Sequence, residues 1–332
     1  MKNTIIIKFC LILLAYITSI GFADISITEI YRFDGDGEAL YGVSDLVPLD
    51  EGNFVVSDRR MKRVLKVNSE GELVRTAGRD GRGPGEFNGG ANLIVEQSGL
   101  LYVFDLSSSK IAQVFDHDLN YVTTISVELP VDAVALNDSL MMLHYHDYVN
   151  DKYLQVHKYN GERVTSVKHD AGSKEFTRLN DAHLQNIGDG TTVVVYRHLN
   201  RIEYYKLDFS LRNRISIASL PDQSPVYKMP GSDQIAARFT GTQRSIVERA
   251  SYRPEYRIFE AIAVDGKGNL FVQINSELWD SDDNIIVIDE NGDRTGSFNL
   301  PGNQLLLAIG SDDRLYSKTV AGEAVYVYQI NR

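Results

Sequence analysis

Polar side chains recur along this chain at intervals that would let them meet around one axis. Asp45, Asn92, Asp132 and His183 follow one another at spacings of 47, 40 and 51 residues, each near the start of a predicted strand. Carboxylate, amide and imidazole groups bind divalent cations such as calcium or zinc, and they also hydrogen-bond polar ligands. Together with Glu260 they predict a ligand-binding site, with a metal ion as one occupant. The alternative is a wet channel lining, where polar residues need no function.

A glycine-rich segment, RDGRGPGEF at residues 79–87, is a candidate for a phosphate-binding loop. A P-loop needs Lys and then Ser or Thr after its last glycine, followed by a helix, and this segment has neither. Its spacing also differs from a dinucleotide-binding fingerprint. We therefore interpret the segment as a link between two structural units, in which Arg79 and Arg82 could still contact anions.

The histidines provide no second ligand cluster at a recognisable spacing. His144 and His146 lie on one face of a predicted strand and could supply two metal ligands, but we interpret them as ordinary strand and loop histidines. The sequence contains neither the metalloprotease motif His-Glu-x-x-His nor the nucleophile motif Gly-x-Ser-x-Gly. The residues therefore predict no catalytic nucleophile.

Repeated strand units must position these side chains. Six segments share one order: a short strand, a turn rich in Gly, Asp and Asn, a second strand, a polar link and a third strand. They begin at Asp45, Asn92, Asp132, His183, Ala261 and Leu306. Gly, Asn and Asp accept the positive φ of tight hairpin turns. Repeats of this size, with about four strands each, predict an all-β fold, the six-bladed β-propeller.

The first strand of the mature chain is expected to close the ring. The segment ISITEIYRF at residues 25–33 has no unit of its own, and the last unit has no room for an outer strand. We expect residues 25–33 to complete the last blade, which removes an exposed sheet edge. A β-sandwich or two small β domains is the alternative, but the repeated turn positions argue against it.

Residues 1–23 have the pattern of a secretory signal peptide. Two lysines flank the start of a mostly apolar run, and Gly21 and Ala23 supply the small residues that precede cleavage. A membrane anchor is the alternative, but the run is short for one. We expect export to the periplasm or outside the cell, with residues 24–332 forming a single propeller domain. Cleavage would remove Cys10, the only cysteine.

The charge of the chain disfavours one class of partner. The formal net charge is −11 at pH 7, from 45 acidic and 34 basic residues. Such a surface repels phosphate backbones, so we expect no nucleic-acid partner. No apolar segment after residue 24 is long enough for a transmembrane helix. We expect a monomer whose partner is a small molecule or a protein.

An insertion at about residues 218–257 lengthens the interval between the fourth and fifth units. Near its end, Tyr252, Arg253, Tyr256 and Arg257 combine aromatic surface with guanidinium donors. This composition is common at recognition surfaces, so we predict a recognition loop. The alternative is an elongated loop that caps one end of the channel.

Two segments resemble a known repeat. GRGPGEFNGGANLIVEQSGLLYVFDLSSSKIAQVFD at residues 81–116 is similar to the NHL-type repeat, and so is FEAIAVDGKGNLFV at residues 259–272. The whole chain resembles the bacterial exported six-bladed β-propeller proteins with NHL/TolB-like repeats. This resemblance implies the fold and assigns no activity. Gluconolactonase-like propellers place Glu, Asn and Asp around a calcium ion. Asp45, Asn92, Asp132 and His183 do not follow the order of those ligands, and the histidine departs from it in type.

Two functions are consistent with these residues. The first is an exported, non-catalytic propeller that binds a small ligand or a protein at the channel mouth, and the absence of a nucleophile motif favours it. The second is a metal-dependent hydrolase, lactonase or lyase, with calcium or zinc held by the channel-lining Asp45, Asn92, Asp132 and His183.

Overall fold

Strands dominate the computed structural model, which describes residues 25–105, 110–128, 130–145, 154–167, 177–188, 190–279, 281–289 and 291–332. Six four-stranded antiparallel sheets contain most of these strands. The predicted signal peptide, residues 1–23, lies outside the described residues, as does His146.

The first three blades each consist of four consecutive strands. Blade one contains β2 (Val43–Pro48), β3 (Phe54–Asp58), β4 (Arg63–Val67) and β5 (Leu73–Ala77). Blade two contains β6 (Ala91–Gln97), β7 (Leu100–Asp105), β8 (Ile111–Asp116) and β9 (Tyr121–Ser126). Blade three contains β10 (Asp132–Asn137), β11 (Leu140–His144), β12 (Leu154–Lys158) and β13 (Arg163–Val167).

The last three blades complete the ring. Blade four contains β14 (Ala182–Asn186), β15 (Thr192–Tyr196), β16 (Ile202–Tyr205) and β17 (Leu211–Ile215). Blade five contains β20 (Phe259–Val264), β21 (Leu270–Ile274), β22 (Ile285–Ile288) and β23 (Arg294–Phe298). Blade six contains β24 (Gln304–Ile309), β25 (Arg314–Thr319), β26 (Val325–Asn331) and β1 (Ser26–Phe33). Short 3₁₀ turns form at η1 (Asp50–Gly52) and η2 (Thr177–Asn180).

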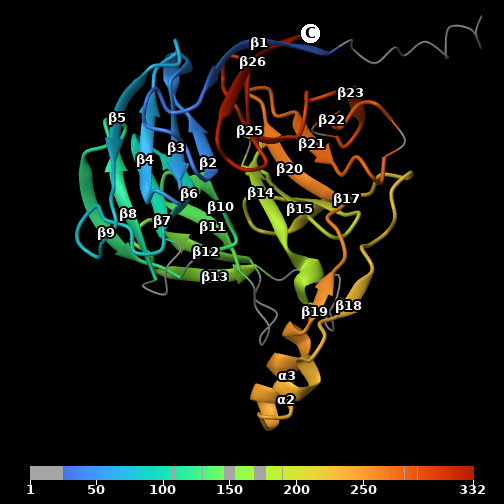
Figure 1. The fold of residues 1–332 in the computed structure, drawn as a ribbon. Helices are drawn as coiled ribbons and strands as arrows, with labels where there is room; N and C mark the ends of the chain where they lie inside the picture. The colour runs from blue at the N-terminus through green and yellow to red at the C-terminus, as the bar shows by residue number, and fades with distance from the viewer. Residues whose placement is uncertain are drawn as a thin grey trace, which may run out of the picture.

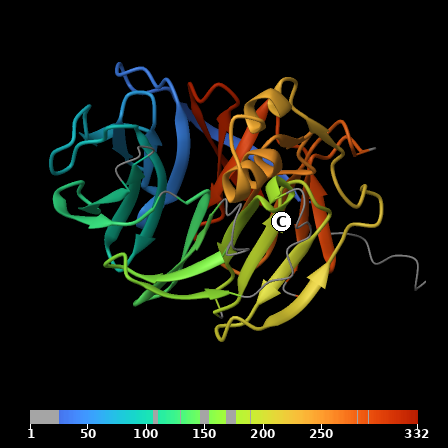
Figure 2. The same ribbon diagram turned by 90° about the horizontal axis from the view of Figure 1, so that it is seen from below.

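The six sheets stand around a central axis (Figure 2). Their inner strands contact one another in the order β2, β6, β10, β14, β20, β24, and β24 also contacts β2. The observed inner strands begin within two residues of the predicted unit starts. The predicted six-bladed propeller is therefore confirmed.

The core lies between blades. Each of six clusters of buried apolar residues combines side chains from two neighbouring blades. The second strands β3, β15 and β21 are buried along their whole length, whereas the outer strands β9 and β17 are mostly exposed. A blade therefore has two apolar faces and needs a neighbour on each side, which explains why the sequence must repeat.

Blade six is closed by the two ends of the chain. Strand β1 pairs antiparallel with β26, from Ser26 opposite Asn331 to Phe33 opposite Val325, as Figure 1 shows near the C-terminus. Phe33 is buried and packs edge-on against Phe54 of blade one, with ring centroids 6.2 Å apart. The predicted closure by the N-terminal strand is confirmed, and it covers the edge that β26 would otherwise expose.

We expect Phe33→Leu to lower the free energy of unfolding by about 1–2 kcal/mol, because the smaller side chain leaves a void between blades six and one. The control on the same strand is Ile30→Ala, since Ile30 is 43% exposed. Urea denaturation of both variants measures the difference. Equal stability of the two variants would show that β1 does not lock the ring.

The link at residues 79–87 ends in a buried anchor. Phe87 is fully buried among apolar residues of blades one and two, 6.2 Å from the Phe115 ring. Its N–H donates to the Arg79 carbonyl at 2.9 Å, and the Gly83 N–H donates to the Glu86 carboxylate at 2.8 Å. The segment folds on itself, and its position between β5 and β6 is that of the link expected from the sequence.

A buried aspartate fixes the next part of this link. The Asp105 carboxylate at the end of β7 accepts hydrogen bonds from the N–H groups of Asn88, Gly89 and Gly90, at 2.8, 2.8 and 3.2 Å. Gly90 has φ of 120° and lies against the Arg59 carbonyl, so a larger residue would be strained and would clash. These contacts give Asp105, the last residue of β7, a structural role.

The insertion between β17 and β20 contains helices that the sequence does not predict. It comprises β18 (Val226–Lys228), α2 (Ser232–Ala236), α3 (Gly241–Ala250) and β19 (Tyr252–Pro254), with β18 and β19 paired. Figure 1 shows α2 and α3 projecting below the propeller. No residue of α3 is buried, so α3 has no apolar stripe that could be recognised in the sequence. Among the described residues, every helix is too short or too polar to cross a bilayer.

Candidate functional site

Two cavities follow one another along the channel between the inner strands. The first, which we call the mouth cavity, lies where the inner strands begin and measures about 200 Å³. It is lined by residues that include Asp45, Asp132, His183, Arg197, Arg257, Glu260 and Lys318. The second, the inner cavity, lies where the inner strands end and measures about 380 Å³. The lining of both includes Asp45, Asp132, Gln185 and Leu307, so these residues mark the boundary between them.

Strand irregularities direct the acidic side chains at the channel mouth. Register shifts occur at Ser44 and Asp45 in β2, at Asn92 in β6 and at Glu260 in β20. Such bulges re-aim side chains near functional sites. In β2 the buried Ser57 hydroxyl fills the gap and accepts a hydrogen bond from the Asp45 N–H at 3.0 Å.

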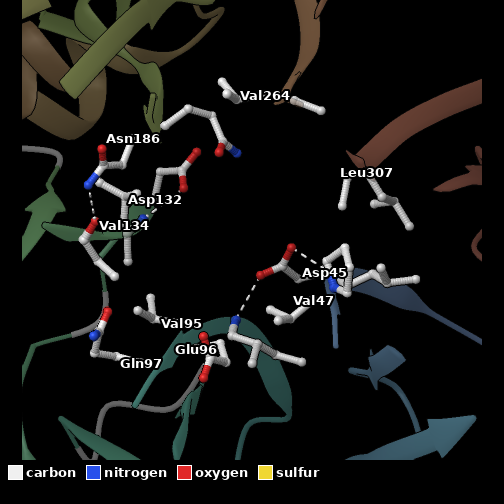
Figure 3. Close-up of a pocket in the computed structure, with 18 of the residues that line it drawn as sticks. Asp45, Val47, Val95, Glu96, Gln97, Asp132, Val134, Asn186, Val264 and Leu307 are labelled. Atoms are coloured by element: carbon white, nitrogen blue, oxygen red, sulfur yellow. Dashed lines mark hydrogen bonds between the residues drawn. The ribbon is translucent and has the colours of Figure 1, made fainter. Parts of the chain in front are cut away.

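Asp45 joins blade one to blade two. Its carboxylate accepts hydrogen bonds from the N–H groups of Ile94, at 2.7 Å, and Leu46, at 2.9 Å. Figure 3 shows the Asp45 and Asp132 side chains pointing into the inner cavity. Burial raises the pKa of Asp45 to about 6, and the nearby charge of Asp132 acts in the same direction.

His183, Asp132 and Arg197 form one contact group in the mouth cavity. His183 Nε2 lies 3.1 Å from the Glu260 carbonyl, which can only accept, so Nε2 carries the proton. His183 Nδ1 lies 3.3 Å from Arg197 Nη2 and 3.2 Å from Asp132 Oδ2. Burial, assisted by the Arg197 charge, lowers the pKa of His183 to about 4. The neutral ring therefore accepts the Arg197 hydrogen bond at Nδ1.

Arg197 retains unused donors beside the cavity. Its side chain is 18% exposed, and its buried Nε has no hydrogen-bond partner within the described part of the chain. The Asp132 carboxylate lies 4.0 Å from Arg197 Nη2, beyond hydrogen-bond distance. Burial lowers the pKa of Arg197, and the charge of Asp132 opposes this effect. A guanidinium has five N–H donors, and a buried donor without an acceptor is costly.

Two further cations complete the lining. Lys318 extends from β25, and its Nζ donates to the carbonyls of Val43, at 2.8 Å, and Ser44, at 3.1 Å. Burial lowers the pKa of Lys318 to about 8, and Asp45 partly opposes that shift. Arg257 lies nearer the rim, 44% exposed, with its Nη1 3.5 Å from Glu260 Oε2.

The structure brings together only some of the four polar residues that the sequence predicts to line the channel. Asp132 and His183 touch, and the pKa of Asp45 is influenced by Asp132, but Asn92 lies outside the described lining of both cavities. Within the described residues no group of three or more His, Cys, Asp or Glu side chains could hold a metal ion. Both nitrogens of His183 and both carboxylate oxygens of Asp45 already contact protein groups. This donor set does not fit a bound cation.

The predicted recognition loop divides into separate parts. Tyr252 and Arg253 belong to β19, where Arg253 donates to the Ala250 carbonyl. Tyr256 packs against the cluster between blades four and five, and its carbonyl lies 2.7 Å from His198 Nδ1. Only Arg257 of the four lines the mouth cavity.

Sequence reasoning missed Arg197 and Lys318. The channel-lining residues predicted from the sequence lie on the inner strands. Lys318 lies on β25, the second strand of blade six, and Arg197 directly follows β15, the second strand of blade four. A basic residue at the end of an otherwise buried second strand was the available signal, because its long side chain can reach the channel over the inner strand.

The fold is shared with solved structures, although their sequences differ widely from this one. A Bacteroides fragilis protein described as exported matches 95% of this chain and 98% of its own at 12% identity, with a TM-score of 0.62. A member of the DUF4221 family from Bacteroides vulgatus matches 92% and 98% at 10% identity, with a TM-score of 0.61. A catalytically inactive virginiamycin B lyase from Staphylococcus aureus, with quinupristin, matches 92% and 99% at 8% identity, with a TM-score of 0.53.

At these identities the similarity concerns the fold alone. No protein-family model matches the chain, and no curated protein matches it significantly. The neighbours include both an exported protein and a lyase, so the fold does not choose between binding and catalysis. The function must be inferred from the residues of the channel.

Asp45→Asn should change how stability depends on pH. Because its folded-state pKa of about 6 exceeds the ordinary value of 3.8, Asp45 contributes stability that is fully present below pH 3.8 and is lost as the pH rises through 6. The Asn variant lacks this loss, so its stability relative to the unchanged protein should rise between pH 4.5 and pH 7. Urea denaturation at both pH values measures the effect. A constant difference would contradict the burial assigned to Asp45.

Proposed function

We propose that this protein is an exported β-propeller that binds a small anionic molecule in the mouth cavity. Arg197 lines this cavity and has a buried Nε without a hydrogen-bond partner within the described residues, and this unsatisfied donor carries the proposal. The signal-like residues 1–23 support export, as does the fold shared with a protein described as exported. The assignment to the NHL/TolB-like propellers, and a monomeric state, belong to the same proposal.

The contacts of the charged groups favour an anion over a cation. Asp45 accepts two backbone N–H bonds, and Asp132 accepts one from Ala133 at 2.7 Å and also contacts His183. Asp45 is already bonded through both oxygens and Asp132 through Oδ1, whereas Arg197 has a donor to spare. A ligand that supplies acceptor oxygens, such as a carboxylate or phosphate, would satisfy those donors in a bidentate arrangement.

The geometry favours a small molecule over a folded protein partner. Arg197 lines a cavity of about 200 Å³, which a small acid can enter and a folded surface cannot. Arg257, at the more exposed rim, could add a second contact to the same ligand.

A catalytic role is a second candidate. It is favoured by three groups around one cavity whose pKa values are displaced by burial: Asp45 to about 6, His183 to about 4 and Lys318 to about 8. Displaced pKa values are common at sites of acid–base chemistry, although structural networks produce them too. A lyase or hydrolase that acts through these groups would bind its substrate in the same cavity.

Isothermal titration calorimetry tests the binding proposal. Malonate, pyruvate and inorganic phosphate serve as anionic probes, and malonamide is the neutral control of similar size. We expect saturable binding of at least one anion, weakened by added salt, and no binding of malonamide. Equal affinity for malonate and malonamide, or binding of no anion, would contradict an anion site at Arg197.

A further inference from the structure

Lys318 lies where blade six meets blade one, with its amine beside the mouth cavity. Its Nζ contacts two acceptors, the carbonyls of Val43 and Ser44, at 2.8 and 3.1 Å. A neutral amine has two N–H groups and one lone pair, whereas an ammonium has three N–H groups. The two carbonyls can therefore satisfy both hydrogens of the neutral amine, and its lone pair then points away from them. Lys318 also lines the mouth cavity, so a molecule bound there lies beside its amine.

The surroundings of Lys318 increase the fraction of neutral amine, although the ammonium still predominates at pH 7. Burial is the main cause that lowers its pKa, and the charges of Arg59 and Arg257 lower it further, while Asp45 raises it. The result, a pKa of about 8 against the ordinary 10.5, leaves much more free amine at pH 7 than an exposed lysine has. Desolvation of this kind activates lysine as a nucleophile.

We propose that Lys318 forms an imine with a small carbonyl acid, whose carboxylate binds Arg197 while its carbonyl carbon faces Nζ. The mouth cavity is lined by both residues, and its volume of about 200 Å³ accommodates a molecule such as a 2-oxo acid. The identity of the ligand rests on the proposed function, because the anion site at Arg197 binds the carboxylate. The reactivity of Lys318 depends only on its own surroundings.

The chemistry is a condensation that releases water. The Nζ lone pair attacks the carbonyl carbon, the C=O π bond breaks, and one amine proton moves to the oxygen to give a carbinolamine. The hydroxyl then leaves as water with the second amine proton, and a C=N bond forms. Imine formation involves no change of oxidation state. A hydride from an added borohydride reagent, with a proton from water, reduces the imine to a stable secondary amine.

Reductive trapping tests the proposal on the full-length mature protein. The protein is incubated at pH 7 with pyruvate and sodium cyanoborohydride, and lysine modification is measured by peptide mass spectrometry. Lys267, whose side chain is 62% exposed, is the comparison within the same molecule. A pKa of about 8 in place of the ordinary 10.5 increases the free-amine fraction at pH 7 by about 300-fold, partly offset by lower nucleophilicity, so we expect Lys318 to react at least about tenfold faster than Lys267.

Variants and a second probe separate the two residues. Lys318→Arg keeps the charge and the donors but should lose all modification at position 318. Propanal has a carbonyl and no carboxylate, so Arg197→Gln should reduce trapping of pyruvate at Lys318 and leave trapping of propanal unchanged. This pattern supports the proposal.

Two results would overturn it in distinguishable ways. If Lys318 reacts no faster than Lys267 with either probe, Lys318 is not a reactive amine, and anion binding measured by calorimetry can still stand. If propanal modifies Lys318 rapidly but pyruvate has no advantage and no anion binds, the carbonyl-acid ligand is wrong together with the anion site.

Discussion

Glu203→Ala is expected to lower the free energy of unfolding by about 3–5 kcal/mol, because it removes a buried carboxylate that two arginines and two tyrosine hydroxyls contact. Glu203 is fully buried in blade four, where the hydroxyls of Tyr196 and Tyr205 donate to Oε2 at 3.0 and 2.7 Å. Arg201 and Arg214 donate to Oε1, each at 2.8 Å through Nε. Arg201 is 12% exposed, so it cannot recover full hydration when the carboxylate is removed.

The loss of stability caused by Glu203→Ala should depend on pH. Burial raises the pKa of Glu203, but the hydrogen bonds from Tyr205 and Arg201 outweigh burial and hold the pKa below the ordinary 4.5. A lowered folded-state pKa gives stability that is present above pH 4.5 and is lost as the pH falls through the folded value. The difference between Glu203→Ala and the unchanged protein should therefore shrink in acid.

The control is an exposed ion pair of the same types. Glu162 lies 2.8 Å from Lys158, with both side chains about half exposed, so Glu162→Ala should cost no more than about 0.5 kcal/mol. Guanidinium denaturation at pH 7 and pH 4 compares the variants. If Glu203→Ala matches Glu162→Ala at pH 7, the buried cluster does not stabilise blade four.

Arg197→Gln is expected to weaken the binding of malonate by about 30- to 100-fold, since a charge-assisted, bidentate contact is lost from a desolvated site. Arg197→Lys keeps the charge but not the planar fork, so it should recover only part of the affinity. Calorimetric titration of each variant gives the affinities.

Two controls accompany this prediction. Arg244 is on α3, 55% exposed and paired with Glu248, so Arg244→Gln should leave malonate binding unchanged. Thermal unfolding of Arg197→Gln shows whether the fold persists, because the change also removes a cation near Asp132. An affinity unchanged in a folded Arg197→Gln protein would place the anion elsewhere.

The fold could be predicted from the sequence because the features that specify it are local and repeat along the chain. Glycine turns such as that at Gly52 and buried second strands recur in several units, and the Gly-rich link that ends at Phe87 marks the boundary between two of them. Closure by β1 could be predicted as well, because the last unit was one strand short. These features depend on residue type and order, which the sequence states directly.

The candidate site was less predictable because it is assembled by long side chains from several strands. Asp132 and His183 come from inner strands and were found, whereas Arg197 and Lys318 reach the channel from the second strands of blades four and six. Asn92 occupies the expected sequence position and lies in a bulge of β6, but it is outside the described lining of the cavities. A bulge adds one residue to a strand and so changes which side chains face the channel. The sequence pattern does not reveal where bulges occur.

The helices of the insertion illustrate a second limit. Helix α3 is stabilised by local contacts, such as Arg244 with Glu248 at 2.8 Å, and buries no residue. Prediction of a helix from periodicity requires an apolar face, and α3 has none.

A crystal structure of the protein grown with malonate tests the central claim most directly. We predict one malonate carboxylate in the mouth cavity, within hydrogen-bond distance of the Arg197 guanidinium, with Lys318 and Arg257 lining the same space. Malonate bound only on the outer surface, with water molecules as the sole partners of Arg197, would contradict the assignment of this cavity as an anion-binding site.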